Sequence, residues 1–345
     1  MIDNSLQPFL ADTWFLILGL ILAFYVITDG FDLGIGILSL ATRRETHRSA
    51  MLESIGHVWD ANETWLVVLG GALFGAFPAV YAMVLHALYG PVMVMIGGLI
   101  LRGAAFEFRH AARDKRGWDR VFGAGSLLAA LAQGAILGQL VSGLREGWVG
   151  WAFSAVAALG VVAGYSLLGA SYLVMRTSGG LGQASRRHAR VSLWTTVGMA
   201  AVLTLATPFA SVEVRNAWLD PHRMPILGVL GLLAVSAFGY ILHALRRGVR
   251  GPFRASVLLF AVSFGGLALS IYPAMVPGHV TILQAASSAP TLLFMLVGIG
   301  MLLPVMIGYN AYQYLVFRGR IVVHEGGERM ADAPSRPTSA PSGSM

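Results

Sequence analysis

Apolar residues fill most of the chain in long runs that are separated by short polar connections. A hydrocarbon core of about 30 Å requires about 20 apolar helical residues to cross it. Nine runs reach that length, at 14–41, 51–77, 84–106, 120–144, 151–175, 190–211, 224–245, 253–276 and 289–317. The pattern predicts an all-α integral membrane protein with nine transmembrane helices. The first run lacks a preceding basic segment and a small-residue cleavage site, so we expect a retained helix rather than a signal peptide.

Composition agrees with this class. Hydrophobic residues make up 56% of the 345 positions and charged residues only 12%, whereas a soluble domain carries roughly 25% charged residues. The absence of cysteine excludes disulfides, thiolate metal sites and covalent attachment of a c-type haem. The net charge of +7 does not indicate nucleic acid as a partner, because the basic residues gather in the connections between runs.

The distribution of basic residues predicts the orientation. The connections at 42–50, 107–120, 176–190 and 246–254, together with the segment after 317, hold twenty of the 24 Lys and Arg residues. Basic loops mark the cytoplasmic side, so we expect the N-terminus outside and the C-terminus inside. Residues 1–317 would then form one membrane domain. The Pro- and Ser-rich tail, 318–345, is predicted to be a disordered cytoplasmic segment.

Five carboxylates fall in the first three runs, where charge is expensive. Asp29 lies about 22 Å along the first helix from Trp14 at 1.5 Å per residue, and Asp32 is one turn further. Asp60 is expected about 13 Å inside a second helix that begins at residue 51. The other two are Glu63, one turn beyond Asp60, and Glu107, at the inner end of the third run. All five are predicted to lie in the cytoplasmic half of the membrane.

Residue spacing predicts how these side chains are directed. Asp29 and Asp32 are three residues apart, and so are His57, Asp60 and Glu63, which places each set on one helix face. The first helix also contains small residues in the segment GFDLGIG, namely Gly30, Gly34 and Gly36. Small residues let membrane helices approach closely. We therefore expect the two polar faces to meet across a tightly packed interface.

Several interpretations of the acidic cluster stay open at this point. Its carboxylates could be structural, for example by pairing with Arg102 inside the third run, or they could form a proton route, which is a common role for ionisable groups inside a membrane. A site for a lipid head group or a cation is a third reading. At the level of the whole chain, a stand-alone proton-coupled transporter is an alternative, although transporters usually repeat their polar sites in two halves.

Particular segments carry a resemblance to a known family. The segments are ITDGFDLGIGIL (27–38), VWDANETWLVVLGGALFGAFPAVYA (58–82), LILRGAAFEFR (99–109), GASYLVMRT (169–177) and LLPVMIGYNAYQYLVFRGRI (302–321). In this order they closely resemble subunit II of the cytochrome bd-type quinol oxidases. The resemblance extends over almost the whole chain up to the tail.

The resemblance implies a nine-helix subunit of a bacterial respiratory complex in the cytoplasmic (inner) membrane, which oxidises quinol and reduces oxygen to water. Subunit I of that complex would hold haems b and d and the quinol site, while this chain would bind no cofactor firmly, support subunit I and contribute a cytoplasmic-side proton path. Asp60 matches the acid of a family motif, and Glu107 matches an acidic position of the third helix. Small accessory membrane subunits and a structural quinone or lipid are left open.

Departures from the family pattern affect individual positions. Ala61 replaces a common Gly, and Leu283 and Gln284 stand where many relatives have Trp-Asp. His57 stands where relatives often have Pro or another nonbasic residue, and two interpretations stay open for it: a further titratable group near the predicted entrance, or a histidine that simply lies near the surface. Histidine offers a further check on cofactors, because a bis-histidine haem requires two imidazoles that face each other at one depth. His57 and His243 are the one pair that the predicted topology brings to a similar depth.

Overall fold

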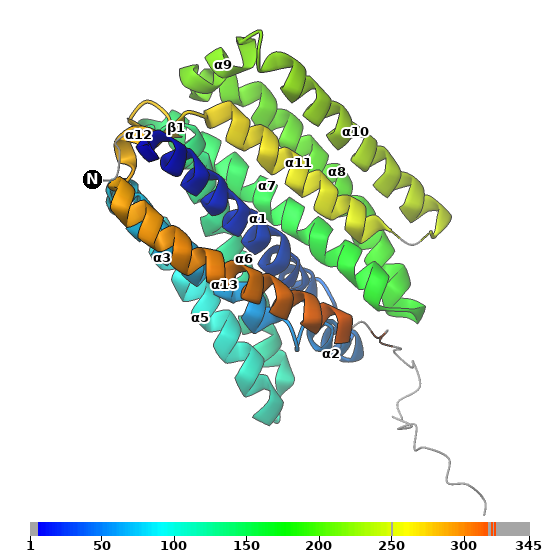
Figure 1. Ribbon diagram of the computed structural model, residues 1–345. Coiled ribbons are helices and arrows are strands. Elements are labelled where there is room, and N and C mark those ends of the chain that lie inside the picture. The colour runs from blue at the N-terminus through cyan, green and yellow to red at the C-terminus, as the bar shows by residue number, and fades with distance from the viewer. Residues whose placement is uncertain (1–5, 250, 317–318, 320, 322–345) are drawn as a thin grey trace, which may run out of the picture.

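The computed structural model describes residues 6–249, 251–316, 319 and 321, which form a bundle of long helices that run back and forth between two ends (Figure 1). The predicted tail, 318–345, lies outside these residues apart from 319 and 321. The long helices are α1 (Leu6–Leu40), α3 (Trp59–Ala76), α5 (Tyr89–Ala111), α6 (Lys115–Val141), α7 (Gly147–Arg176), α8 (Gly179–Ala210), α10 (Met224–Arg247), α11 (Pro252–Ile271) and α13 (Ala289–Val316).

The predicted all-α membrane fold is confirmed. Among the described residues, eight helices are long and apolar enough to cross a membrane, and a ninth span results when α3 and α4 (Pro78–Ala87) are taken as one bent pair. The two helices differ in direction by 119°. The bend occurs at Pro78, the first residue of α4, where proline has no N–H to donate and its fixed φ suits a helix start.

Short elements close the bundle at its ends. They are α2 (Glu45–Glu53), α9 (Val212–Leu219), α12 (Ile282–Ala285) and an antiparallel pair of strands, β1 (Ala274–Val276) and β2 (Val280–Thr281). Gln284 lies in α12, where its side chain accepts from the Thr281 amide at 3.0 Å and its own amide donates to the Thr281 hydroxyl at 3.3 Å. This capping box gives Gln284 a structural place in the loop before α13.

The start of the second span differs from the prediction. Instead of one helix over 51–77, the chain forms α2, a turn at 54–58 and then α3, which begins at Trp59. Arg48 of α2 binds Asp119 of α6 at 2.7 Å and donates to the carbonyls of Thr42 and Arg43 at 3.0 and 2.9 Å. These contacts hold α2 against the bundle end, so Asp60 lies in the first turn of α3 rather than about 13 Å along a longer helix.

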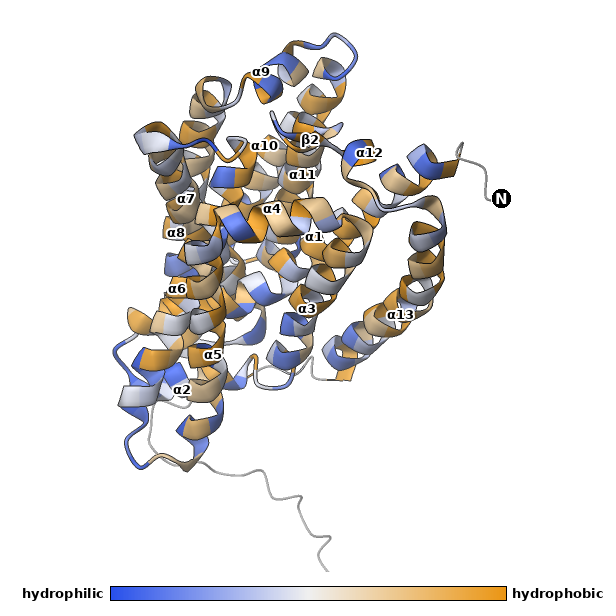
Figure 2. Cartoon of the chain, turned by 90° about the vertical axis from the view of Figure 1, so that its left-hand side faces the viewer, coloured by the Kyte–Doolittle hydropathy of each residue, from blue (hydrophilic) through white to orange (hydrophobic). Residues whose placement is uncertain are grey.

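The bundle is built around α1, which contacts α3, α6 and α7. Its core includes Phe31, which stacks on Tyr172 of α7 with 4.3 Å between ring centroids. The long helices consist largely of hydrophobic residues (Figure 2). Many large apolar side chains on them are exposed, as expected for helices that meet lipid or another membrane chain. The least buried spans are α13, with 6% of its apolar window inside the structure, and α10, with 11%.

The glycines of α1 lie at its closest approaches to α7 and α6. A Cβ on Gly34 would overlap the carbonyl oxygen of Tyr165, and a Cβ on Gly169 of α7 would lie 2.6 Å from the Ile35 amide nitrogen. A Cβ on Gly30 would lie 2.8 Å from the Tyr165 ring, and a Cβ on Gly36 would overlap the Ser126 hydroxyl of α6. The glycine face of α1 therefore meets α7 and α6, whereas its acidic side chains are bound to residues of α3 and α5.

Candidate functional site

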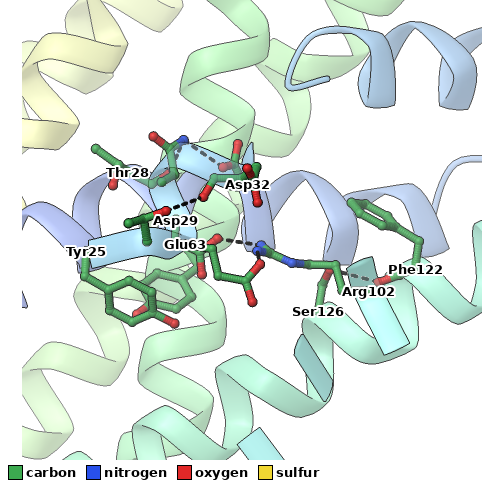
Figure 3. Close-up of polar contacts among 12 residues, drawn as sticks. Tyr25, Thr28, Asp29, Asp32, Glu63, Arg102, Phe122 and Ser126 are labelled. Atoms are coloured by element: carbon green, nitrogen blue, oxygen red, sulfur yellow. Dashed lines mark hydrogen bonds and ion pairs between the residues drawn. The ribbon is translucent and has the colours of Figure 1, made fainter. Parts of the chain in front are cut away.

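Arg102 of α5 is the centre of a buried polar cluster formed by the first three spans (Figure 3). One guanidinium nitrogen, Nη1, donates to Asp29 Oδ1 of α1 at 2.6 Å, and the other, Nη2, donates to Glu63 Oε2 of α3 at 2.8 Å. The Arg102 side chain is 1% exposed, that of Asp29 0% and that of Glu63 25%. One guanidinium thus joins three helices, and Glu63 is its partner with access to the surface.

Asp32 belongs to a second set of contacts, one turn along α1. Its Oδ2 accepts from Asn62 Nδ2 of α3 at 2.8 Å, and Asn62 Oδ1 accepts from the Tyr314 hydroxyl of α13 at 2.9 Å. Asn62 also donates to the Thr28 carbonyl at 3.4 Å. The amide therefore links a fully buried carboxylate to a phenol on α13, which makes few other polar contacts with the bundle.

A third set of contacts begins at Tyr25, one helical turn before Asp29 on α1, whereas Asp32 lies one turn after it. Tyr25 Oη accepts from Gln133 Nε2 of α6 at 2.7 Å, and Gln133 Oε1 accepts from the Tyr165 hydroxyl of α7 at 2.6 Å. Because Tyr25 and Asp29 are four residues apart on α1, they share a helix face. Polar groups therefore follow this face of α1 from Tyr25 past Asp29 to Asp32.

The charges of the cluster do not balance. Arg102 can compensate one of the three carboxylates of Asp29, Asp32 and Glu63, so full ionisation would leave an excess of two negative charges in a low-dielectric region. Two carboxylate oxygens, Asp29 Oδ2 and Asp32 Oδ1, are buried without a hydrogen bond to any described residue. An excess of buried carboxylates is relieved by protons, which gives the cluster the chemistry of a proton-exchanging site.

The other predicted site residues lie at the surface. Asp60 is exposed in the first turn of α3, and Glu107 is exposed near the end of α5. His57 is exposed in the turn at 54–58. The spacing predicted that it shares a helix face with Asp60 and Glu63, but it lies outside α3 and does not. Of the five carboxylates, Asp29 and Glu63 bind Arg102 and Asp32 lies one turn along α1 from Asp29. Asp60 and Glu107 lie outside that cluster at the same end of the bundle.

Five neutral residues of the network were not identified from the sequence: Tyr25, Asn62, Gln133, Tyr165 and Tyr314. Asn62 lies inside the segment that carries Asp60 and Glu63, and a polar side chain in an otherwise apolar helix is a usable signal. The other four come from spans whose neighbours the sequence does not reveal. Their roles follow only from which helices pack on α1.

A separate charged cluster lies closer to the bundle end. Asp119 of α6 is 3% exposed and accepts from Arg48 at 2.7 Å and from Arg109 of α5 at 2.5 Å. Arg109 also donates to the Ser49 hydroxyl of α2 at 2.9 Å. These contacts fix α2 to α5 and α6. We assign this cluster a structural role, because both carboxylate oxygens have cationic partners.

Histidines provide no enclosed axial pair in the part of the chain that the structure describes. His47 is the one buried imidazole there, at 8% exposure, while His57 and His243 are both exposed. Within the same residues, no group of three or more His, Asp or Glu side chains is arranged to hold a metal ion. The donor set of His57 and His243 therefore does not fit a buried bis-histidine haem.

Comparisons with known proteins place the chain in a family. The family model described as "Cytochrome bd terminal oxidase subunit II" matches residues 10–317. The chain is 30% identical to cytochrome bd-I ubiquinol oxidase subunit 2 of Escherichia coli (strain K12), over 93% of this chain and 97% of that protein. It is 29% identical to cytochrome bd ubiquinol oxidase subunit 2 of Bacillus subtilis (strain 168), over 90% and 97%.

The fold agrees with a solved structure. The bd oxidase from Geobacillus thermodenitrificans superposes with a TM-score of 0.76 at 18% identity, over 90% of this chain and 98% of that one. Together with the apolar helices, the bacterial relatives show a multi-pass protein of the bacterial inner membrane. The family match favours the oxidase interpretation over the stand-alone transporter. The chain belongs to the cytochrome bd terminal oxidase subunit II family.

Proposed function

We propose that this chain supports the haem-bearing subunit I of its oxidase and conducts protons from the cytoplasm toward that subunit, where oxygen is reduced. The observation that carries the proposal is a buried cluster of three carboxylates and one guanidinium, which binds two of them. Two of the buried carboxylate oxygens have no hydrogen bond to any described residue. Reduction of oxygen to water consumes protons. A buried site that can exchange protons, with one member partly exposed, suits their delivery.

The positions of the acids suggest an order for the transfer. Asp60 and Glu107 are exposed at the end of the bundle that carries the basic connections, so they would collect protons from water. Glu63 lies one turn from Asp60 on α3 and is 25% exposed, which makes it the step between the surface and the cluster. Asp29 and Asp32, both fully buried, would hold the proton inside the bundle.

Arg102 would prevent a proton from being held permanently on one acid. Because its guanidinium binds Asp29 and Glu63 together, a proton on one acid can be balanced by a stronger contact of Arg102 to the other. Asn62 and Tyr314 would hold Asp32 in place from α3 and α13. We assign Arg102, Asn62 and Tyr314 as positioning residues, since none of them needs to change its protonation state.

Support of subunit I would come from the rigid inner face of the bundle. The glycine contacts of α1 with α7 and α6 fix the helix that carries Asp29 and Asp32. On the other side, α3, α5 and α13 present exposed apolar side chains such as Val67, Ile100 and Phe294. We propose that this side packs against the partner, because α3 and α5 also carry Asp60, Glu63 and Glu107 of the proposed route.

The redox chemistry is assigned to the partner. When bound there, haems b and d would carry electrons from quinol to oxygen. The described histidines of this chain do not offer an enclosed axial pair, and we assign both kinds of haem to subunit I. Its own residues would bind, hold and pass protons.

Purification of the tagged chain from its native membranes tests the assignment to a two-subunit oxidase. We expect a larger haem-bearing chain to co-purify, an absorption spectrum with haem bands and oxygen consumption driven by quinol. A colourless chain that purifies alone and transports a solute would refute the proposal. Haem bands in the separated smaller chain would refute the assignment of the haems to subunit I.

Single variants test the route. Asp60→Asn keeps the size of an exposed side chain but removes its ionisable group, so haem content should be normal while oxygen consumption falls roughly tenfold. Asp60→Glu should retain part of the activity. Glu146→Gln removes an exposed carboxylate at the opposite end and should leave turnover unchanged. Full oxygen consumption by an intact Asp60→Asn complex would exclude an obligatory role for Asp60 and make Glu107 the next position to test.

A further inference from the structure

Six arginines at one end of α8, α10 and α11 have no carboxylate partner among the residues that the structure describes. They are Arg186, Arg187 and Arg190 of α8, Arg246 and Arg247 of α10, and Arg254 of α11, which we call the arginine face. The sequence contains no Asp or Glu at 147–212 or 221–324. Among the described residues, none of the six forms an ion pair, and all except Arg186 are exposed.

The helices bring these arginines together. The helix α10 contacts both α8 and α11, and the three lie side by side in Figure 1. Arg186 Nη2 donates to the Gly248 carbonyl, next to Arg247, at 3.3 Å. At about 100° per residue, Arg186, Arg187 and Arg190 cover an arc of about 100° on α8. The arginines of α8 and α10 therefore lie next to one another on the same surface.

One nitrogen of this surface is left without an acceptor. Arg186 Nη1 is buried and makes no hydrogen bond to any described residue. A buried guanidinium N–H without a partner is costly, and the nearby arginines add further positive charge. The other charged cluster at this end of the bundle differs, because Arg48 and Arg109 there share Asp119. The arginine face has no anionic partner within the described part of the chain.

A cavity adjoins the arginine face on the side of α1. It has a volume of about 400 Å³ and is lined by Leu38 of α1 and by Arg187, His188, Val191 and Ser192 of α8. Val191 and Ser192 lie one turn from Arg187 and His188, or about 6 Å further along α8 toward the apolar middle of the helix. The lining changes from charged to apolar in that direction. This is the order of groups in a phospholipid, from phosphate to acyl chain.

We propose that the arginine face binds the phosphate of an anionic phospholipid from the leaflet at that end. Membrane-adjacent clusters of Lys and Arg attract anionic lipids, and arginine binds phosphate through two parallel N–H donors. Exposed apolar side chains continue along the same helices, including Val191, Trp194 and Tyr240. They provide contacts for acyl chains that neither free phosphate nor a soluble acidic protein would use.

The test compares two variants of the purified oxidase complex that each lose three positive charges from the same end. The test variant is Arg187→Gln, Arg190→Gln and Arg247→Gln, all exposed positions, so folding should be preserved. The control is Arg113→Gln, Lys115→Gln and Arg116→Gln, in the connection before α6 and its first turn. Each complex is placed in nanodiscs of dioleoylphosphatidylcholine with increasing dioleoylphosphatidylglycerol, and bound phosphatidylglycerol is counted by native mass spectrometry.

We expect the test variant to bind phosphatidylglycerol roughly a hundredfold more weakly than the native complex, since three basic residues are removed and each basic residue near a membrane contributes a factor of roughly five. The control should bind within about twofold of the native complex. Equal binding by all three would overturn the proposal. An equal loss in both variants would show an effect of net charge alone, and displacement of the lipid by inorganic phosphate at matched concentration would show a site for a free anion. A protein that co-purifies on this face in place of the lipid would also refute it.

Discussion

Among single residues, Arg102 stands out because it is a charged side chain that is almost fully buried within the membrane-spanning helices. Its side chain is 1% exposed and binds carboxylates from two other helices, so it compensates charge that the membrane interior would not tolerate alone. The same contacts agree with the structural interpretation of the acids, in which they pair with Arg102. The structural and the proton-conducting roles are compatible, because the cluster holds more carboxylates than cations.

Replacement of Arg102 should therefore destabilise the complex. Arg102→Gln removes the cation and leaves Asp29 and Glu63 without charge compensation, which we expect to cost about 3 kcal/mol or more. The measurement is thermal unfolding of the purified complex, together with its yield. Arg113→Gln, an exposed arginine at the same end, is the control and should change stability by less than about 0.5 kcal/mol.

A double variant separates charge from packing. If the cost comes from uncompensated carboxylates, Arg102→Gln combined with Asp29→Asn should be less destabilised than the sum of the two single variants, because the second change removes one of those charges. Additive losses would show that Arg102 contributes through its packing alone. In that case the number of uncompensated carboxylates in the cluster would not affect the stability of the complex.

Asp119 is predicted to hold α2 in place. Asp119→Asn keeps the size of the side chain but removes the charge shared by Arg48 and Arg109, which should cost about 2–3 kcal/mol. Hydrogen exchange of the α2 amides should become faster. Asp114→Asn is the matched control, because Asp114 caps α6 through the Arg116 amide at 2.9 Å and asparagine caps equally well. Unchanged exchange in α2 would show that Asp119 is not its anchor.

At the scale of helices, the close approach of α1 and α7 depends on Gly34 and Gly169. A Cβ on Gly34 would overlap the Tyr165 carbonyl, which is rigid backbone, so even Gly34→Ala must separate the helices. We expect a lower yield of assembled complex and a fall in its haem content. The readouts are the haem spectrum and the amount of purified complex per cell.

Gly70→Ala is the control for that change. Gly70 lies within α3, and an added Cβ would meet nothing within 4 Å. Since alanine favours a helix more than glycine does, this variant should be as stable as the native protein or more stable by about 0.5–1 kcal/mol. Normal haem content in Gly34→Ala would show that α1 and α7 can separate without consequence for assembly.

The sequence predicted the membrane-spanning helices better than the turns that interrupt them. Runs of apolar residues indicate helices of sufficient length directly, and eight of the nine predicted spans correspond to single long helices. The turn at 54–58 could not be predicted, because it contains no proline and depends on Arg48, which binds a residue 71 positions away. Glycine spacing indicated close packing of α1, but the identity of the neighbouring helices required the structure.

The site was predictable in part for a similar reason. Asp29, Asp32 and Glu63 were identified because charge is rare in a membrane helix, and pairing with Arg102 was among the structural alternatives. Tyr314 and Gln133 could not be assigned from sequence, because tyrosine and glutamine in apolar helices have many uses and their partners lie 252 and 108 residues away. Exposure of Asp60 and Glu107 depended on where α3 and α5 begin and end.

At the scale of the whole molecule, the basic connections predict an orientation that the fold alone does not set. Reporter fusions after Thr46, Lys115, Gly182 and Gly248 should report the cytoplasm, and fusions after Gly147 and His279 the outside. Fusions after Lys115 and Gly147 are the most informative pair, since they flank α6. The same location for both would contradict the topology and the direction of the proposed proton route.

We propose that protons for oxygen reduction pass through this chain. The most direct test is a rapid-mixing experiment in which the reduced complex reacts with oxygen while a pH dye reports proton uptake and absorption reports the haems. The variant is Asp60→Asn with Glu107→Gln, which removes both exposed acids, and Glu146→Gln is the control. We predict normal haem content and oxygen binding, with proton uptake slowed about tenfold in the double variant alone. Proton uptake at the native rate in an intact double variant would contradict the claim.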